Sequence, residues 1–224
     1  MPEDDTTHPS SLTVKGLATR RRIVDAAARL IFERGVANTS IDQVRRAAGV
    51  GGSQIAHYFR DKRELTRHVI GARHHDLRAF HTQPRLGGLD DFDALQAWAD
   101  ACVADIDTVY RVGGCVYGSL AGELIEGDDD IHRDLSAGYD QWIELLRTGL
   151  TAMRDRGDLR PEADPRHLAV SLVIAHQGGA MLTYVTGDAE PLRAAVTAGV
   201  EYVRSFAPPT RPLTGRPRPR RARS

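Results

Sequence analysis

The stretch IDQVRRAAGVGGSQIAHYFRDKREL, residues 41–65, decides the fold of this 224-residue chain. Its first part carries apolar residues at three- and four-residue intervals, which is the spacing of one helix face. A glycine-rich corner at 49–52 follows, and the next short segment ends in the aromatic pair at 58–59. The sequence therefore predicts two short helices joined by a tight turn.

Two short helices can pack at a steep angle only when a third helix completes their core. Residues 17–34 supply it, because their apolar positions are spaced for a helix and Gly35 follows as a stop. Thr39 or Ser40 can cap the next helix. A longer helix is predicted over 62–81. Together these segments indicate a three-helix helix-turn-helix, whose second short helix enters the major groove of DNA.

The rest of the chain is also predicted to be helical, so the fold class is all-α. No segment shows the alternation typical of strands. Helices are expected over 89–111, 119–125, a long stretch closing near 157, 165–184, and 190 to before 208. The expected domains are a disordered arm at 1–14, the helix-turn-helix at 15–62, a helical domain at 63–207, and a disordered basic tail at 208–224.

Charge is distributed unevenly along the chain although its formal net charge is zero. Residues 15–70 carry twelve basic and five acidic side chains, and residues 86–164 carry six and eighteen. The tail at 208–224 adds six arginines and no acid. This asymmetry indicates that one end faces a polyanion, although two solvated faces would give the same pattern.

Composition excludes several classes of protein. The two cysteines, Cys102 and Cys115, are too few for a disulfide framework and belong to no zinc-type spacing. Neither a signal peptide nor an apolar run of 18 residues is found. We therefore expect a soluble, cytoplasmic protein with no membrane partner.

The stretch and its surroundings resemble the tetracycline-repressor (TetR) family of transcriptional regulators. The resemblance extends over about fifty residues and rests on Phe32, Gly35, Thr39, Ile41, Val44, Ala47, Gly49, Val50, His57, Tyr58, Phe59, Lys62 and Leu65. It implies a ligand-responsive regulator, a repressor released from a palindromic DNA operator by a small-molecule effector.

Candidate base-reading residues lie on the second short helix. Gln54 can pair with adenine, Ala56 can touch a thymine methyl group, and Ser53 can bond either base. The family usually has Ser or Thr where Gly51 stands and often Lys at Gly52. Either Ser53 caps this helix one turn late, or Gly51 leaves its amide open to a phosphate.

Candidate phosphate contacts surround this helix. His57 resembles the phosphate-contacting histidine of the family, and the hydroxyl of Tyr58 can reach the DNA backbone. Positioning on phosphates is the expected role of Thr39, Arg45, Arg46 and Lys62. The alternative for the last three is simple solvation.

The segment GGCVYGSLAGEL, residues 113–124, resembles the Gly-Cys-x-x-Gly-Ser/Asn-Leu-Ala-x-Glu signature of one branch of the family. Its small residues indicate either close helix packing or contact with the effector. His176 is a polar group inside an apolar helix, which needs a buried partner or a ligand. The candidate ligand-binding residues are Trp98, Cys102, Tyr110, Cys115, Tyr117, Tyr139, Trp142, His176 and Met181.

The last two helices resemble the family's dimer helices, which implies a homodimer. The residues expected at its four-helix interface are Ala169, Val173, Ala180, Tyr184, Leu192, Ala195, Val196, Gly199, Val200 and Val203. A core within one chain would give the same pattern.

Two other functions, an enzyme and a metal or redox sensor, have weaker signals in the sequence. Residues 117–121 fail the GxSxG pattern of a hydrolase, and the glycines at 49–52 fit no dinucleotide fingerprint, so no catalytic residues and no cofactor are expected. A metal or redox sensor would use the histidines of 62–81 or the two thiols. These histidines have no matching cluster elsewhere, so no metal is expected.

Overall fold

The computed structural model describes residues 13–124 and 128–209, and no strand occurs within these two ranges. The all-α prediction is confirmed. The predicted disorder falls mainly on 1–12 and 210–224, which lie outside the described residues. The elements are α1 (Val14–Arg34), α2 (Ile41–Ala48), α3 (Gly52–Tyr58), α4 (Lys62–His81), η1 (Pro84–Leu86), α5 (Phe92–Ala104), η2 (Ile106–Tyr110), α6 (Arg111–Gly113), α7 (Gly118–Leu124), α8 (Asp129–Arg156), α9 (Pro165–Thr186) and α10 (Glu190–Arg204).

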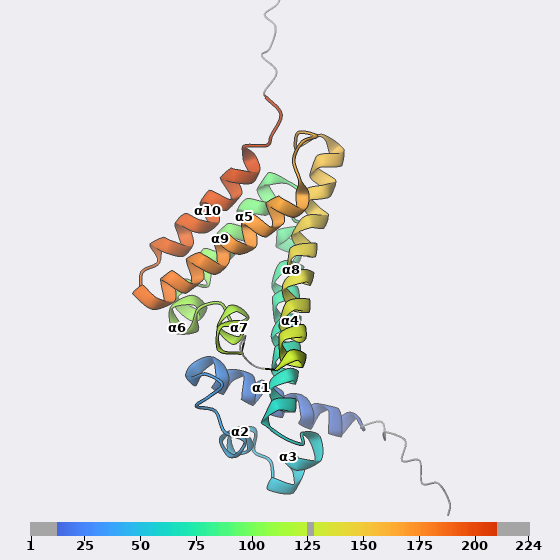
Figure 1. The fold of residues 1–224 in the computed structure, drawn as a ribbon, viewed down its shortest axis with the longest axis vertical. Helices are drawn as coiled ribbons and strands as arrows, with labels where there is room; N and C mark the ends of the chain where they lie inside the picture. The colour runs from blue at the N-terminus through green and yellow to red at the C-terminus, as the bar shows by residue number, and fades with distance from the viewer. Residues whose placement is uncertain (1–12, 125–127, 210–224) are drawn as a thin grey trace, which may run out of the picture.

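Helices α1, α2 and α3 form one small unit at the lower end of the molecule in Figure 1. Ile23 and Val44 are buried between them with Phe59. Ser40, rather than Thr39, caps α2, because its side chain accepts from the backbone of Gln43 while the Gln43 side chain bonds back to the backbone of Ser40. This capping box fixes where the first short helix starts.

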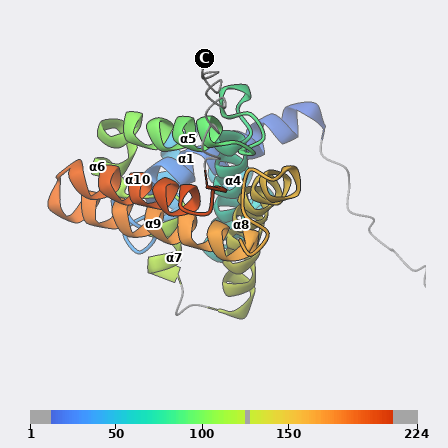
Figure 2. The same ribbon diagram turned by 90° about the horizontal axis from the view of Figure 1, so that it is seen from above.

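The helices from α5 to α10 form a second, upper unit. Helix α4 connects the two units by packing against both α1 and α8. In the upper part, α9 lies between α8 and α10, and α10 also covers α5. Figure 2 shows these helices from above, with α9 and α10 side by side. Helix α4 is therefore in contact with both α1 and α8.

Helix α1 differs from its prediction at the start. It begins at Val14, three residues before the predicted start at Leu17, because the Thr13 side chain accepts from the backbone N–H of Gly16. Leu17, expected in the core, is 53% exposed, and Ala47 of α2 is also exposed. The apolar spacing predicted the helices correctly but overestimated the width of their buried faces.

The predicted helix over 89–111 is interrupted. Helix α5 ends at Ala104, and a π-helical turn follows in which the carbonyl of Asp105 accepts from Val109 and Tyr110, at 2.9 and 3.4 Å. The extra residue in this turn shifts the helical register. As a result, the side chain of Tyr110 is buried in the centre of the upper unit.

Helix α9 is the one helix among the described residues that is long and apolar enough to span a membrane by length and composition. The fold explains this. One of its sides is packed on α8 and α10, and the opposite side carries apolar residues that this chain leaves exposed.

Candidate DNA-binding and effector sites

The residues predicted to read bases lie on the outer surface of α3. Ile55 and Phe59 are buried at 4% and 3% exposure and attach α3 to the core. The residues left exposed are Gly52, Ser53, Gln54, Ala56 and His57. Tyr58 is half-buried, and its ring meets that of His57 edge to face at 5.0 Å. The geometry permits a groove-reading role for these side chains.

The start of α3 settles which residue caps it. The helix begins at Gly52, and Gly51 occupies the N-cap position with no side-chain hydrogen bond. Ser53 therefore does not cap the helix one turn late. Because neither glycine has a side chain over the first turn, its backbone N–H groups face solvent without a capping oxygen.

Three of the predicted phosphate contacts, Arg45, Arg46 and Lys62, have side chains that reach the surface, and the fourth, Thr39, does not. Arg45 and Arg46 both bond to the carboxylate of Asp42, at 2.8 and 2.7 Å, and Arg45 in particular lowers the pKa of that carboxyl. Lys62 is half-buried at the start of α4. Thr39 corrects the prediction, because it is 3% exposed and its hydroxyl donates to the carbonyl of Gly35 at 2.9 Å. Its side chain closes the α1–α2 loop from inside.

An ion-pair network joins the start of α4 to the start of α8. Arg63 bonds to Asp128 and, at 2.7 Å, to Asp130, while Arg67 bonds to Asp134 at 2.6 Å. Hydrogen bonds from Arg63 hold the pKa of the Asp128 and Asp130 carboxyls below their usual range. The network fixes the first turns of α4 against the second unit. Sequence reasoning did not identify it, because its members lie more than sixty residues apart.

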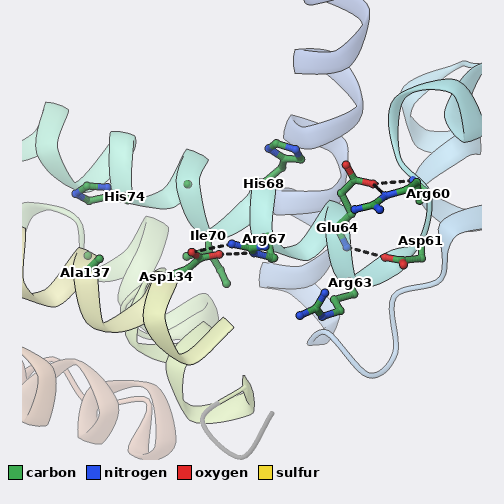
Figure 3. A pocket seen from close by; sticks show the side chains of 12 residues that line it. Arg60, Asp61, Arg63, Glu64, Arg67, His68, Ile70, His74, Asp134 and Ala137 are labelled. Carbon is green, nitrogen blue, oxygen red and sulfur yellow. Dashed lines mark hydrogen bonds and ion pairs between the residues drawn. The ribbon is translucent and has the colours of Figure 1, made fainter. Parts of the chain in front are cut away.

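A cavity of about 490 Å³ opens beside this network, and Figure 3 shows its side chains. Its lining mixes charged and polar side chains, among them His68, His74 and Asp134, with apolar ones such as Ile70. A second cavity, of about 140 Å³, lies between α4 and α8, and a third, of about 10 Å³, lies between α1 and α7 beside Arg73 of α4. None of these three cavities is lined by a predicted ligand-binding residue.

The predicted ligand-binding residues instead gather in a packed aromatic cluster. The two indole N–H groups of Trp98 and Trp142 donate to Nε2 of His81, at 3.1 and 2.9 Å. Nδ1 of His81 lies 2.8 Å from the carbonyl of Leu77, so this nitrogen carries the proton and donates. Burial lowers the pKa of His81 to about 4. This histidine was assigned no role from the sequence, and it lies buried at the centre of the core.

His176 enters the same cluster from α9. Its Nε2 lies 2.8 Å from the hydroxyl of Tyr110, and its ring meets that of Trp142 edge to face. Nδ1 of His176 is buried and has no hydrogen-bond partner among the described residues. Burial lowers the pKa of His176 to about 3, so the ring is neutral. A buried nitrogen without a partner is costly, and it offers one polar contact to a guest.

Four further predicted residues border this cluster. Tyr117 is buried and donates to the carbonyl of Leu135 at 2.8 Å, and its ring meets the ring of the half-buried Tyr139. Burial raises the pKa of both thiols, Cys102 and Cys115, so neither is activated for oxidation.

Met181 does not join the cluster, which corrects the prediction. It is 64% exposed and lies on the outer side of α9. Because α9 is apolar on two sides, its sequence pattern did not separate the buried side from the exposed one. His176, five residues earlier, lies on the buried side.

Within residues 13–124 and 128–209, no group of three or more His, Cys, Asp or Glu residues could hold a metal ion. Ser119, the residue of the tested hydrolase pattern, donates its hydroxyl to the backbone carbonyl of Cys115, just before α7, at 2.7 Å. Its hydroxyl proton is therefore held by a carbonyl and not by a base that could activate a nucleophile.

Several known proteins are similar to this chain. BetI of Escherichia coli, named an HTH-type transcriptional regulator, is 34% identical over 158 residues, which cover 61% of this chain and 78% of BetI. SrpR of Pseudomonas putida is 27% identical over 144 residues, and the match spans 63% of each chain. A TetR regulator structure from Chloroflexus aurantiacus has a TM-score of 0.73 at 28% identity and covers 87% of this chain and 98% of its own.

The small three-helix unit with its exposed α3 defines a helix-turn-helix DNA-binding protein. Residues 23–69 match the family described as "Bacterial regulatory proteins, tetR family", and residues 92–199 match "Tetracyclin repressor-like, C-terminal domain". With the similarity to BetI, these matches show that the chain belongs to the TetR family of bacterial transcriptional regulators.

Proposed function

We propose that this chain is a homodimeric repressor that acts in the cytoplasm and leaves a palindromic operator when a small molecule enters its aromatic cluster. Residues 15–62 would bind DNA, and residues 63–207 would bind the effector and form the dimer. The observation that carries the proposal is that α3 exposes polar residues on its outer side while its apolar residues on the opposite side are buried in the core. DhaR of Mycobacterium, 22% identical over 174 residues, is named a transcriptional repressor.

The outer side of α9 supports the dimer. Its exposed apolar residues are Ile174, Met181, Leu182, Tyr184 and Val185. A contiguous apolar surface of this kind marks an interaction site in most soluble proteins. The exposed Gly178 lies among them with open space around it, so a second helix can approach closely. Two copies would then place two α3 helices on the half-sites of a palindrome.

The interface expected from sequence is largely wrong in its residues. Buried within this chain are Ala169, Val173, Ala180, Leu192, Val196, Gly199, Val200 and Val203. They form the contact between α9 and α10. The proposed dimer therefore uses chiefly the opposite side of α9, with Tyr202 as the exposed apolar contribution of α10.

The aromatic cluster supports an effector that is mainly apolar and carries one polar group. Its walls are two indoles and the phenols of Tyr110, Tyr117 and Tyr139, which favour a flat or hydrophobic guest. Nδ1 of His176 offers the polar contact. Since none of the three cavities reaches these residues, the guest must displace side chains to enter.

DNA binding is tested by replacing the reading surface. We expect Gln54→Ala, His57→Ala and Lys62→Ala together to reduce affinity for a duplex that the wild-type protein selects from a random library. The matched control is Gln141→Ala, His132→Ala and Arg154→Ala, which removes the same kinds of side chain from α8. Unchanged affinity in the α3 variant would refute the proposed reading surface. Affinity should also fall as salt rises: the logarithm of the binding constant should decrease against the logarithm of the salt concentration with a slope of about −0.9 per phosphate contacted.

Effector binding is tested by thermal stabilisation against a library of apolar metabolites and antibiotics. Compounds that raise the melting temperature should also release the selected duplex. The variant His176→Phe keeps a ring in place but removes the polar contact, so it should lose the response to those compounds. The control Met181→Leu changes an exposed residue and should keep it. A full response in His176→Phe would show that the effector does not bind at His176.

A further inference from the structure

The segment of residues 113–123 touches both units of the molecule. In Figure 1 it runs through α6 and α7, which lie between α1 and the lower end of α9. One of its contacts is with Phe32 of α1. A Cβ atom added at Gly113 would lie 2.5 Å from the Phe32 ring, so only glycine permits this approach. The segment is thereby fitted against the end of α1.

The second contact with the DNA-binding unit is made by Glu123. Its carboxylate accepts a hydrogen bond of 2.6 Å from the backbone N–H of Val36, in the loop that leads to α2. A Cβ atom at Gly35 would lie 2.8 Å from the same carboxylate, and Gly35 has a φ of +80°. The loop is therefore shaped around Glu123, and Thr39 closes the same loop from within. A shift of this carboxylate would move the start of α2.

The middle of the segment is fixed in the aromatic cluster. Tyr117 donates to Leu135 and packs beside Gly138, where a Cβ atom would overlap its hydroxyl. The thiol of Cys115 lies 3.5 Å from Nε2 of Gln177, which donates to it from α9. A guest that displaces these side chains must move the same segment that bonds to the α1–α2 loop.

We propose that residues 113–123 transmit the state of the aromatic cluster to the helix-turn-helix, and that Glu123 is the positioning residue at the receiving end. This inference rests on the proposed function, because it needs a DNA-binding unit and a site in the cluster. It explains the signature segment by its contacts: the glycines allow close packing, Tyr117 senses the cluster, and Glu123 orients the loop. Coupling of this kind is reciprocal, so DNA must also alter the cluster.

The experiment uses the selected duplex as the probe and tryptophan fluorescence as the readout. The chain has two tryptophans, and both lie in the cluster. Saturating duplex should change tryptophan emission in the wild type and in Glu123→Gln, which keeps an acceptor oxygen. Glu123→Ala should lose more than half of this change and bind the duplex about fivefold more weakly or worse, at the lower end of allosteric coupling. Glu33→Ala removes an equal charge from the end of α1 and serves as the control.

The outcomes separate the two proposals. A wild-type protein that selects no duplex would refute the proposed function itself. A wild type that binds the duplex without any change in emission would overturn the transmission route and leave DNA binding intact. The same holds if Glu123→Ala gives the full wild-type change. Rescue by Glu123→Gln distinguishes a positioning role from a general effect of charge.

Discussion

At the scale of single residues, two histidines determine the chemistry of the core. His81 accepts hydrogen bonds from both indoles of the chain, and His176 bonds to Tyr110. Both rings must be neutral, because burial disfavours their charged forms. Their pKa values of about 4 and 3 lie well below the ordinary value near 6.5. The core is thus sensitive to acid.

We expect the free energy of unfolding to fall as the pH drops from 6.5 to 5. In this window the unfolded chain binds protons at His81 and His176 and the folded chain does not, so acid favours unfolding. The loss is roughly 2 kcal/mol for each histidine, at about 1.4 kcal/mol per pH unit. Urea titrations at several pH values measure it. His176→Phe should reduce the slope of the unfolding free energy against pH, while His75→Gln, at an exposed position, should not. An equal slope in the wild type and both variants would contradict the assignment of this pH dependence to the buried histidines.

The N-cap of α3 gives a second residue-scale prediction. Gly51 has a φ of −74° and open space around its Cβ position, so a side chain fits without strain. Gly51→Ser should supply the missing capping oxygen and raise the free energy of unfolding by a few tenths of a kcal/mol. Thermal unfolding compares it with Gly51→Ala, which adds a Cβ atom but no acceptor and should not stabilise. A stabilising alanine would show that capping is not the cause.

At the scale of helices, close contacts through glycine fix how the elements cross. Gly149 of α8 faces the backbone carbonyl of Leu89, which itself has a φ of +54°. Gly71 of α4 has nothing within 4 Å of its Cβ position. The same substitution must therefore have opposite effects at the two positions.

We predict that Gly149→Ala lowers the free energy of unfolding by about 1–3 kcal/mol, because a backbone carbonyl cannot move aside easily. Gly71→Ala should raise it by about 0.5–1 kcal/mol through lower flexibility of the unfolded chain. Denaturant unfolding of both variants measures the difference. A neutral Gly149→Ala would mean that the 86–89 turn yields more readily than its packing indicates.

The helix-turn-helix could be predicted from sequence because its signals are local. Spacing, a glycine stop and capping residues all lie within fifty residues. Sequence reasoning named the aromatic side chains of the cluster but not His81 at its centre, since the hydrogen bonds of His81 join residues 17 and 61 positions away. Met181 was misplaced because an amphipathic pattern shows which side is apolar, and α9 has two such sides. The π-helical turn at Tyr110 has no simple sequence signal.

At the scale of the whole molecule, the outer side of α9 should determine the oligomeric state. Met181→Glu together with Val185→Glu places two charges on residues that are 64% and 74% exposed in one chain. We expect a monomer in analytical ultracentrifugation and a loss of affinity for the selected duplex of about tenfold or more, since one subunit reaches only one half-site. Val14→Glu, at an 86% exposed apolar residue of α1, should remain dimeric. A dimer that persists in the double variant would exclude this surface.

The tight packing of the aromatic cluster also has a consequence for the rate at which a small molecule could bind there. Trp98 and Tyr117 have no exposed surface, and Trp142 has 1%. Under the proposed function, an inducer would have to wait for a spontaneous opening of the protein before it enters this cluster, so its binding rate should reach a ceiling as its concentration rises. A cell that relies on this switch would respond after a delay set by the breathing of the protein and not by how much inducer arrives.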